Sequence, residues 1–411
     1  MTATEARALL KRFGAFADQF AACFSRRPQR EAATHYLDGL FNDSERKSMQ
    51  AMHGRLSDPG SYEALQHFIT DSPWEAEALW RRLRALVPVR AGILAVDETS
   101  FPKQGKHSVG VKRQYCGALG KIANCQVAVS TVLIDEQLAW PLTFELYLPK
   151  EWLADEPRRR KARIPDTVRF REKWRLALSH VRRALQAGLQ PTAVVADADY
   201  GSTAAFRRGL ERLGLRYGVA IRWFLTVWTP EARRAQTVAE VAGALPESAW
   251  QRVTWADGTK GPLAARFAAL RVRPAKSRGE RWLLCERSLA ADDRKYYLLN
   301  LDADATLDAL VAVARSRWPI EQQYRELKDE LGLDHFEGRS YRGWTHHTVL
   351  TAVAFTFLQH ERLRAEPDDS RPTLPTVRFW VREIIAVLYV IHNRNLMNLL
   401  VSFQRDPPLR R

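Results

Sequence analysis

The chain has 411 residues, which is more than one compact hydrophobic core usually organises, so we expect two or three domains. It carries 63 Lys and Arg against 47 Asp and Glu, a net charge of +16 with a pI near 9.9, and this excess favours a polyanionic partner such as DNA. Four scattered cysteines without a Cys-x-x-Cys pair argue against a zinc ribbon or a disulfide framework. No stretch approaches the roughly 18 apolar residues of a membrane span, and no secretory leader pattern is visible, so we expect a soluble, cytoplasmic protein.

Residues 1–88 predict a helical N-terminal domain. They contain few β-branched runs and show amphipathic spacing, as in Tyr36, Leu37, Leu40 and Phe41. A small helical domain ahead of a basic core is compatible with DNA contact, but a generic helical bundle has the same sequence pattern. Both interpretations stay open at this point.

From residue 91 the pattern changes to strands, and residues 89–222 predict the first part of a mixed α/β core. Three strands come first, then helix, strand, helix, strand, which favours a mixed sheet over a purely parallel one. A polar loop is expected at residues 100–107. The expected strands and helices are 93–96, 125–134, 140–148, 166–188 (helix), 193–196, 202–213 (helix) and 217–221.

Residues 223–295 predict a β-rich insertion, because tryptophans lie there amid alternating segments interrupted by Gly and Pro. A strand at 296–299 then returns to the core, whose second part, 296–365, is helical over 306–331 and 345–363. The tail, 366–411, is predicted to be helical from about 376 to 401 and ends in a basic stretch.

Three acidic residues occupy positions typical of metal ligands. Asp97 and Asp197 each follow a short apolar run that reads as a buried strand, and ligands gather where such strands end. Glu321 lies in a helical stretch whose Pro319 fits best in a first turn, near the positive end of the helix dipole. Oxygen-only ligands of this kind suit a hard divalent cation.

Other acids compete for these roles. Glu98 points to the opposite face from Asp97 if the strand persists, and Asp199 shares the face of Asp197. Glu326 follows Glu321 by five residues, which places it near the opposite side of the helix, where a solvated surface role is the simpler interpretation. We favour Asp97, Asp197 and Glu321.

The blocks around these acids resemble those of the DDE transposases of bacterial insertion sequences. The matching segments are residues 97–111, residues 196–201, and Arg317-x3-Glu321-x6-Lys328. The last is similar to three members of the Tyr-Arg-Glu-Lys signature in the branch that includes the 701 family of insertion sequences. The Tyr position falls on Ala314, a departure that Tyr324 does not repair because it lies on the wrong side of Glu321. The resemblance covers about residues 30–365.

The resemblance implies a ribonuclease H-like core with Asp97, Asp197 and Glu321 as catalytic residues and ligands of two Mg²⁺ ions, for which Mn²⁺ can substitute. It implies cleavage at the element's terminal inverted repeats, strand transfer into target DNA by cut-and-paste movement, and a homodimer on DNA. Three rivals remain: a domesticated DNA-binding protein, a structural or regulatory DNA-binder whose acids are surface residues, and a ribonuclease H-like nuclease without strand transfer.

Basic residues near the acids are candidates for contact with the DNA backbone, with mere solvation as the alternative. They are Lys103, Lys106, His107, Lys112, Arg113, Arg317 and Lys328. In the resemblance, the insertion helps hold a flipped base or hairpin, which would give its tryptophans a stacking role. Each could equally belong to the core of the insertion; they are Trp223, Trp228, Trp250, Trp255 and Trp282. His346 and His347 have no plausible metal partners and are expected to be structural.

Overall fold

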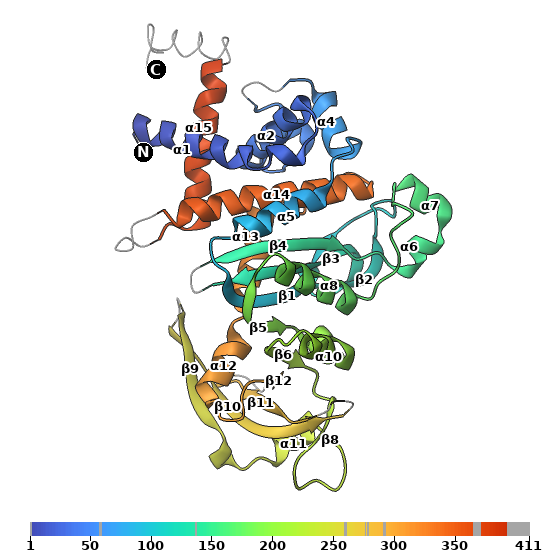
Figure 1. Cartoon of the computed structure of the whole chain (residues 1–411), viewed down its shortest axis with the longest axis vertical. Helices are drawn as coiled ribbons and strands as arrows, with labels where there is room; N and C mark the ends of the chain where they lie inside the picture. Colours follow the sequence, from blue (N-terminus) through green and yellow to red (C-terminus); the bar gives the residue numbers. More distant parts are fainter. Residues whose placement is uncertain are drawn as a thin grey trace, which may run out of the picture.

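The computed structural model describes residues 2–56, 60–135, 138–258, 261–275, 277, 279–290, 293–364 and 371–392. Within these residues, helices from both ends of the chain gather at one end of the molecule, and the strands of the insertion lie at the other (Figure 1). The predicted continuation of the tail helix to 401 and the basic stretch 405–411 lie outside the described residues.

The N-terminal helices pack with the helices that follow the sheet. They are α1 (Ala3–Asp18), α2 (Arg27–Phe41), α3 (Met49–His53), α4 (Tyr62–Thr70) and α5 (Ala76–Leu86), with α14 (Tyr341–Arg362) and α15 (Leu374–His392). Phe13, Phe41 and Phe357 meet where α1, α2 and α14 join, with ring centroids 5.1–6.0 Å apart. Helix α14 is buried on nearly every side because it lies between these helices and the sheet.

Two histidines on α14 support this packing. His346 lies 2.9 Å from the carbonyl oxygens of Ile69 and Trp74, and the Nδ1 atom of His347 lies 2.8 Å from the hydroxyl of Tyr36. Burial lowers the pKa of each imidazole to about 4. Both side chains therefore tie the helical regions together.

The core sheet has the strand arrangement β4-β3-β1-β5-β6, with β4, β3 and β1 antiparallel and β5 and β6 parallel to β1. These strands are β1 (Ala91–Pro102), β3 (Lys121–Ile134), β4 (Ala139–Leu146), β5 (Gln190–Ala196) and β6 (Tyr217–Ile221), and the short β2 (Lys112–Cys116) also pairs with β3. This arrangement confirms the predicted mixed sheet of a ribonuclease H-like core.

The strand that carries Asp97 is longer than predicted. Residues 100–102, expected in a polar loop, continue β1 because Phe101 is buried and the strand stays paired with β3 as far as Pro102 and Cys125. Asp97 therefore lies in the middle of a strand, and the expectation of a strand end was wrong for this residue. Asp197 does follow directly after β5.

The strands of the insertion extend the core sheet. They are β7 (Thr226–Trp228), β8 (Gln236–Thr237), β9 (Gln251–Gly258), β10 (Gly261–Pro274) and β11 (Arg281–Arg287), with α11 (Val238–Ala244) among them, and the strand predicted at 296–299 to return to the core is β12 (Arg294–Leu299). β12 pairs antiparallel with β6, from Tyr296 opposite Ile221 to Leu299 opposite Gly218. Among the described residues, the insertion and the core thus share one continuous sheet.

Different helices cover the two faces of the core sheet. Ala95 and Phe101 of β1 share a core with Ile320 of α13 (Trp318–Asp329) and with α14. Leu94 and Val96 pack on the other face with α8 (Lys173–Gln186) and α10 (Ala204–Arg212). The remaining helices are α6 (Lys150–Ala154), α7 (Glu156–Lys161), α9 (Ala198–Gly201) and α12 (Leu307–Arg315).

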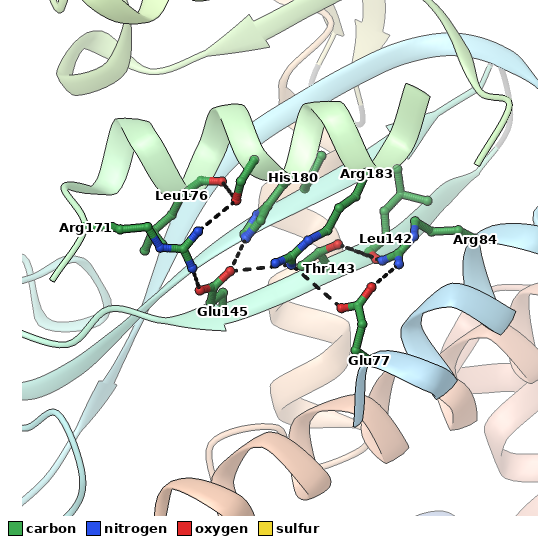
Figure 2. A network of polar contacts seen from close by, with 11 residues as sticks. Glu77, Arg84, Leu142, Thr143, Glu145, Arg171, Leu176, His180 and Arg183 are labelled. Atoms are coloured by element: carbon green, nitrogen blue, oxygen red, sulfur yellow. Dashed lines mark hydrogen bonds and ion pairs between the residues drawn. The ribbon is translucent and has the colours of Figure 1, made fainter. Parts of the chain in front are cut away.

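A buried polar network joins α5, β4 and α8 (Figure 2). Glu145 lies among Arg171, Arg183 and His180, whose Nε2 atom is 3.0 Å from the carboxylate. Arg84 of α5 donates to the carbonyl oxygen of Leu142 at 3.1 Å and pairs with Glu77, which Arg183 also approaches. The network fixes the N-terminal helices to the sheet. Among the described helices, none is long and apolar enough to cross a membrane.

Candidate active site

Asp97 is a buried carboxylate in the middle of the sheet. It is 7% exposed, lies opposite Ser130 of β3, and its Oδ1 atom accepts a hydrogen bond from the N–H of Glu98 at 2.8 Å. Burial raises the pKa of Asp97 to about 7; Arg317 opposes the shift and the nearby Asp197 adds to it. A carboxylate in this position favours the approach of further positive charge.

Asp197 caps the short helix α9 at the end of β5. Its Oδ1 atom accepts hydrogen bonds from the N–H groups of Asp199 at 3.0 Å and Tyr200 at 3.2 Å, and burial raises its pKa. Asp199 instead forms an ion pair with Arg222. This pairing turns the competing acid away, which supports the preference for Asp197.

Glu321 lies in the first turn of α13, where Pro319 also lies, as the sequence predicted. Its side chain is about half exposed, which leaves one carboxylate of the three open to solvent. Glu326 is half-buried elsewhere on the helix, accepts a hydrogen bond from Gln322 at 3.0 Å, and has a pKa raised by burial. The solvated surface expected for Glu326 was therefore wrong, because its side chain packs inward.

Glu98 lies on the other face of the sheet, as predicted. Its carboxylate forms an ion pair with Lys173 at the start of α8, with 2.7 Å between Nζ and Oε2. Burial raises its pKa. The pleat of β1 therefore separates Glu98 from the face on which Asp97 lies.

Arg317 connects the three acids. As the N-cap residue of α13, it pairs with Asp97 through one amino group and with Glu321 through the other, at 2.6 Å. Burial lowers the pKa of its guanidinium, but the charges of Asp97, Glu321 and Asp197 outweigh burial and raise it. Three carboxylates thus share one arginine, and the cluster has an excess of negative charge.

A hollow of about 550 Å³ opens beside this cluster, lined by Asp197, Arg317 and Glu321. Two exposed tryptophans also line it, Trp223 at 61% and Trp318 at 62% exposure. Ala314, at the position of the signature Tyr, contributes to the wall. Basic residues complete the lining: Arg222, Arg294, Lys295 and Arg315. The hollow is therefore acidic at its base, basic around it, and flanked by aromatic rings.

The carboxylates provide the donor chemistry of a hard divalent cation, but Asp97 and Glu321 are paired with Arg317, and Asp197 accepts hydrogen bonds from the N–H groups of Asp199 and Tyr200. Across the described part of the chain, no group of three or more His, Cys, Asp or Glu side chains is close enough together to hold a metal ion. Cation binding at Asp97, Asp197 and Glu321 thus requires the guanidinium of Arg317 to leave the carboxylates.

The predicted DNA-contact residues fall into two groups. Lys106, His107, Lys112 and Arg113 are exposed beyond β1 and at the start of β2, although Lys112 also pairs with Glu151 at 2.7 Å. The two other lysines point into the protein. Lys103 donates to the carbonyl oxygen of Phe336 at 2.8 Å and Lys328 to that of Ser100 at 3.0 Å, and burial lowers both pKa values. In this arrangement Lys103 and Lys328 act as internal ties.

Of the five tryptophans proposed for base stacking, Trp223 lines the hollow, whereas Trp228 is half-buried with the Arg273 guanidinium 5.8 Å from its ring centroid. Trp250 is buried, Trp255 packs against Phe267, and the indole N–H of Trp282 donates to the carbonyl oxygen of Asp302 at 2.9 Å. Sequence reasoning missed Trp318. Its position beside Pro319, three residues before Glu321, was the available signal, because a first-turn side chain is close to whatever the helix end holds.

Comparison with known proteins decides the family. The model of the DDE superfamily endonucleases matches residues 19–262, more than half of the chain. The chain belongs to this family. It is also 27% identical over 339 residues to the probable transposase for insertion sequence element IS701 of Microchaete diplosiphon, with 80% of each chain covered. These matches confirm the DDE-type transposase predicted from the sequence blocks.

The family match contains Asp97 and Asp197, whereas Glu321 lies beyond its end. Glu321 is assigned to the site by its ion pair with Arg317 and its place in the hollow. The chain thus brings together residues from β1, from the end of β5 and from α13, which are separated by 100 and 124 positions in sequence.

Proposed function

We propose that this DDE-family enzyme cleaves DNA at the ends of an insertion sequence and joins the freed 3′ hydroxyls to target DNA in a cut-and-paste reaction. The observation that carries this proposal is the meeting of Asp97, Asp197 and Glu321 at Arg317, beside a hollow with basic and aromatic walls. Phosphodiester chemistry needs concentrated negative charge to hold cations and positive charge to hold phosphate, and both are present.

Asp97, Asp197 and Glu321 are the proposed ligands of two Mg²⁺ ions, which Mn²⁺ can replace. Such ions, when bound, activate the attacking oxygen and stabilise the departing one. The excess of carboxylates over arginine and the raised pKa values of both aspartates support cation binding. Arg317 would then exchange its carboxylate partners for a phosphate group, which the two amino groups of a guanidinium can bind together.

The aromatic side chains of the hollow provide surfaces for an unpaired base. Trp223 and Trp318 are both exposed and both line it, and every base can stack on an aromatic ring. The exposed Lys106, His107, Lys112 and Arg113 are proposed to contact the DNA backbone. Because two element ends must be held together, we propose that a homodimer acts on DNA.

The test is a reaction with a supercoiled plasmid that carries the element's terminal repeats, in the presence of Mg²⁺. Wild-type protein should nick the ends and form joined products, and Asp97→Ala should lose at least about a thousand-fold in rate, because one carboxylate of the cluster is gone. Glu31→Ala is the control, since it removes an exposed carboxylate of α2 that pairs with Arg27, and it should retain activity.

Equal nicking by wild type and Asp97→Ala would remove the catalytic assignment. Nicking without joined products would leave a ribonuclease H-like nuclease. DNA binding without any cleavage by the wild type would favour a domesticated or regulatory DNA-binder. Circular dichroism of both variants shows whether a loss of activity reflects a loss of fold.

A further inference from the structure

A second basic hollow lies between α8 and α10, on the face of the sheet opposite the carboxylates. Its volume is about 640 Å³. Asp97 lies on the face that α13 covers, whereas α8 and α10 pack on the face that carries Leu94 and Val96. The two hollows therefore lie on opposite faces of the core sheet.

Matching faces of the two helices form the hollow. Leu178 and Gly209 lie at its centre, where the helices approach so closely that a Cβ atom on Gly209 would be 2.4 Å from Leu178 Cδ1. On α8, Arg175 and Arg182 are three residues before and four residues after Leu178. On α10, Arg208 and Arg212 are one residue before and three residues after Gly209. Arginines thus flank an apolar floor along both helices.

The charge of this hollow is only partly balanced. Arg175 pairs with Glu172 at 2.9 Å and lies 4.6 Å from the ring of Trp174, so its guanidinium is held in place. Arg182 and Arg212 are exposed, and neither has a carboxylate partner among the residues that the structure describes. Two guanidinium groups without a carboxylate partner among the described residues therefore project toward solvent from packed helices.

The arginines of this groove suit a polyanion. Arg175 and Arg182 are seven residues apart on α8, about 10 Å along its axis, and Arg208 and Arg212 lie across the groove on α10. Both walls therefore carry guanidinium groups beside an apolar floor, which can contact phosphate and sugar oxygens of a DNA strand.

We propose that the groove between α8 and α10 binds the phosphate backbone of a second DNA segment, without sequence preference, through Arg182 and Arg212. This inference rests on the proposed function in that it assumes a DNA substrate, but binding alone tests it. A backbone site on the face away from the carboxylates would hold flanking or target DNA while the element's end occupies the first hollow.

The experiment measures the affinity of the full-length protein for a 30-bp duplex without terminal repeats, by fluorescence anisotropy from about 50 to 200 mM salt. The double variant Arg182→Ala/Arg212→Ala should lower the slope of log K against log salt by about 2 and weaken binding at 0.1 M salt by at least about ten-fold. Arg182→Lys/Arg212→Lys keeps both charges and should retain most of the slope.

The matched control is Arg27→Ala/Arg160→Ala, which removes the same charge from exposed arginines that pair with Glu31 and Glu156. In this control, the slope of log K against log salt should change by less than about half of the change expected for Arg182→Ala/Arg212→Ala. A wild-type slope in Arg182→Ala/Arg212→Ala, in protein with an unchanged melting temperature, would overturn the proposal. If the wild type fails to cleave the plasmid but the slopes differ as expected, the proposed function fails and this inference stands.

Discussion

Two clusters of arginine and carboxylate lie on opposite faces of the core sheet, and their charge balance is opposite. Around Glu145, three basic side chains surround one carboxylate (Figure 2). Burial raises the pKa of Glu145, but His180, Arg171 and Arg183 together lower this pKa by more than burial raises it. Around Arg317, three carboxylates share one guanidinium, and burial raises the pKa of Asp97 to about 7. Basic side chains thus balance the carboxylate around Glu145, whereas around Arg317 the negative charges outnumber the positive one.

The difference shows which cluster is available for function. The Glu145 cluster has enough hydrogen-bond donors and positive charge to compensate for burial, and it joins α5, β4 and α8. The Asp97 cluster retains an excess of negative charge beside an open hollow. Ion pairs with a purely structural role also shift pKa values. The structural cluster and the functional cluster are therefore distinguished by which charge is in excess and by whether solvent reaches the cluster.

Glu145→Gln should be the most destabilising of these substitutions. Removing its charge leaves His180, Arg171 and Arg183 without their anionic partner, and because both arginines are partly exposed the cost should be about 1.5–3 kcal/mol. Asp97→Asn should not destabilise the protein at neutral pH, because it removes a carboxylate from an acid-rich cluster. Urea unfolding in EDTA measures both. Equal destabilisation by the two variants would contradict the comparison.

The two clusters should respond oppositely to pH in metal-free buffer. The pKa of Glu145 in the folded protein lies below 4.5, so its stabilising effect is present above pH 4.5 and is lost as the pH falls. Asp97 has a folded pKa of about 7 against 3.8 when unfolded, so its contribution is favourable at low pH and is lost as the pH rises through 7.

The unfolding free energy of Asp97→Asn should therefore exceed that of the wild type at pH 8 by up to about 4 kcal/mol, and the gap should close toward pH 4. Denaturant titrations at several pH values measure this gap. A gap that is independent of pH would show that Asp97 is ionised throughout the range.

Arg317→Gln should produce a smaller effect that depends on Mg²⁺. Without the guanidinium, the carboxylates lose their internal cation and should bind Mg²⁺ more tightly. A ten-fold gain in affinity corresponds to about 1.4 kcal/mol and to a rise of a few degrees in melting temperature at saturating ion. Arg171→Gln, in the Glu145 cluster, is the control and should show no added response to Mg²⁺. An equal response in both variants would count against the cation site.

Local sequence patterns predicted much of the fold. The apolar runs before Asp97 and Asp197 predicted buried strands, and Tyr217–Ile221 was placed with the correct bounds. The helix predicted at 306–331 is two helices, because a chain that turns at Arg317 can begin α13 with Pro319 in its first turn. The extension of β1 to Pro102 depended on pairing with β3, which short-range polarity cannot reveal.

The sequence by itself determined the family, the three acids and the positive charge of the protein, because each depends on residue type and spacing along the chain. Only the tertiary structure decided that Arg317 lies among the acids, that Trp318 shares the hollow with Trp223, and that Lys103 and Lys328 point inward. The reason is physical: charge balance and burial are properties of neighbours in space, and the neighbours of Asp97 come from β3, from the end of β5 and from α13, at sequence distances of 33 to 220 positions.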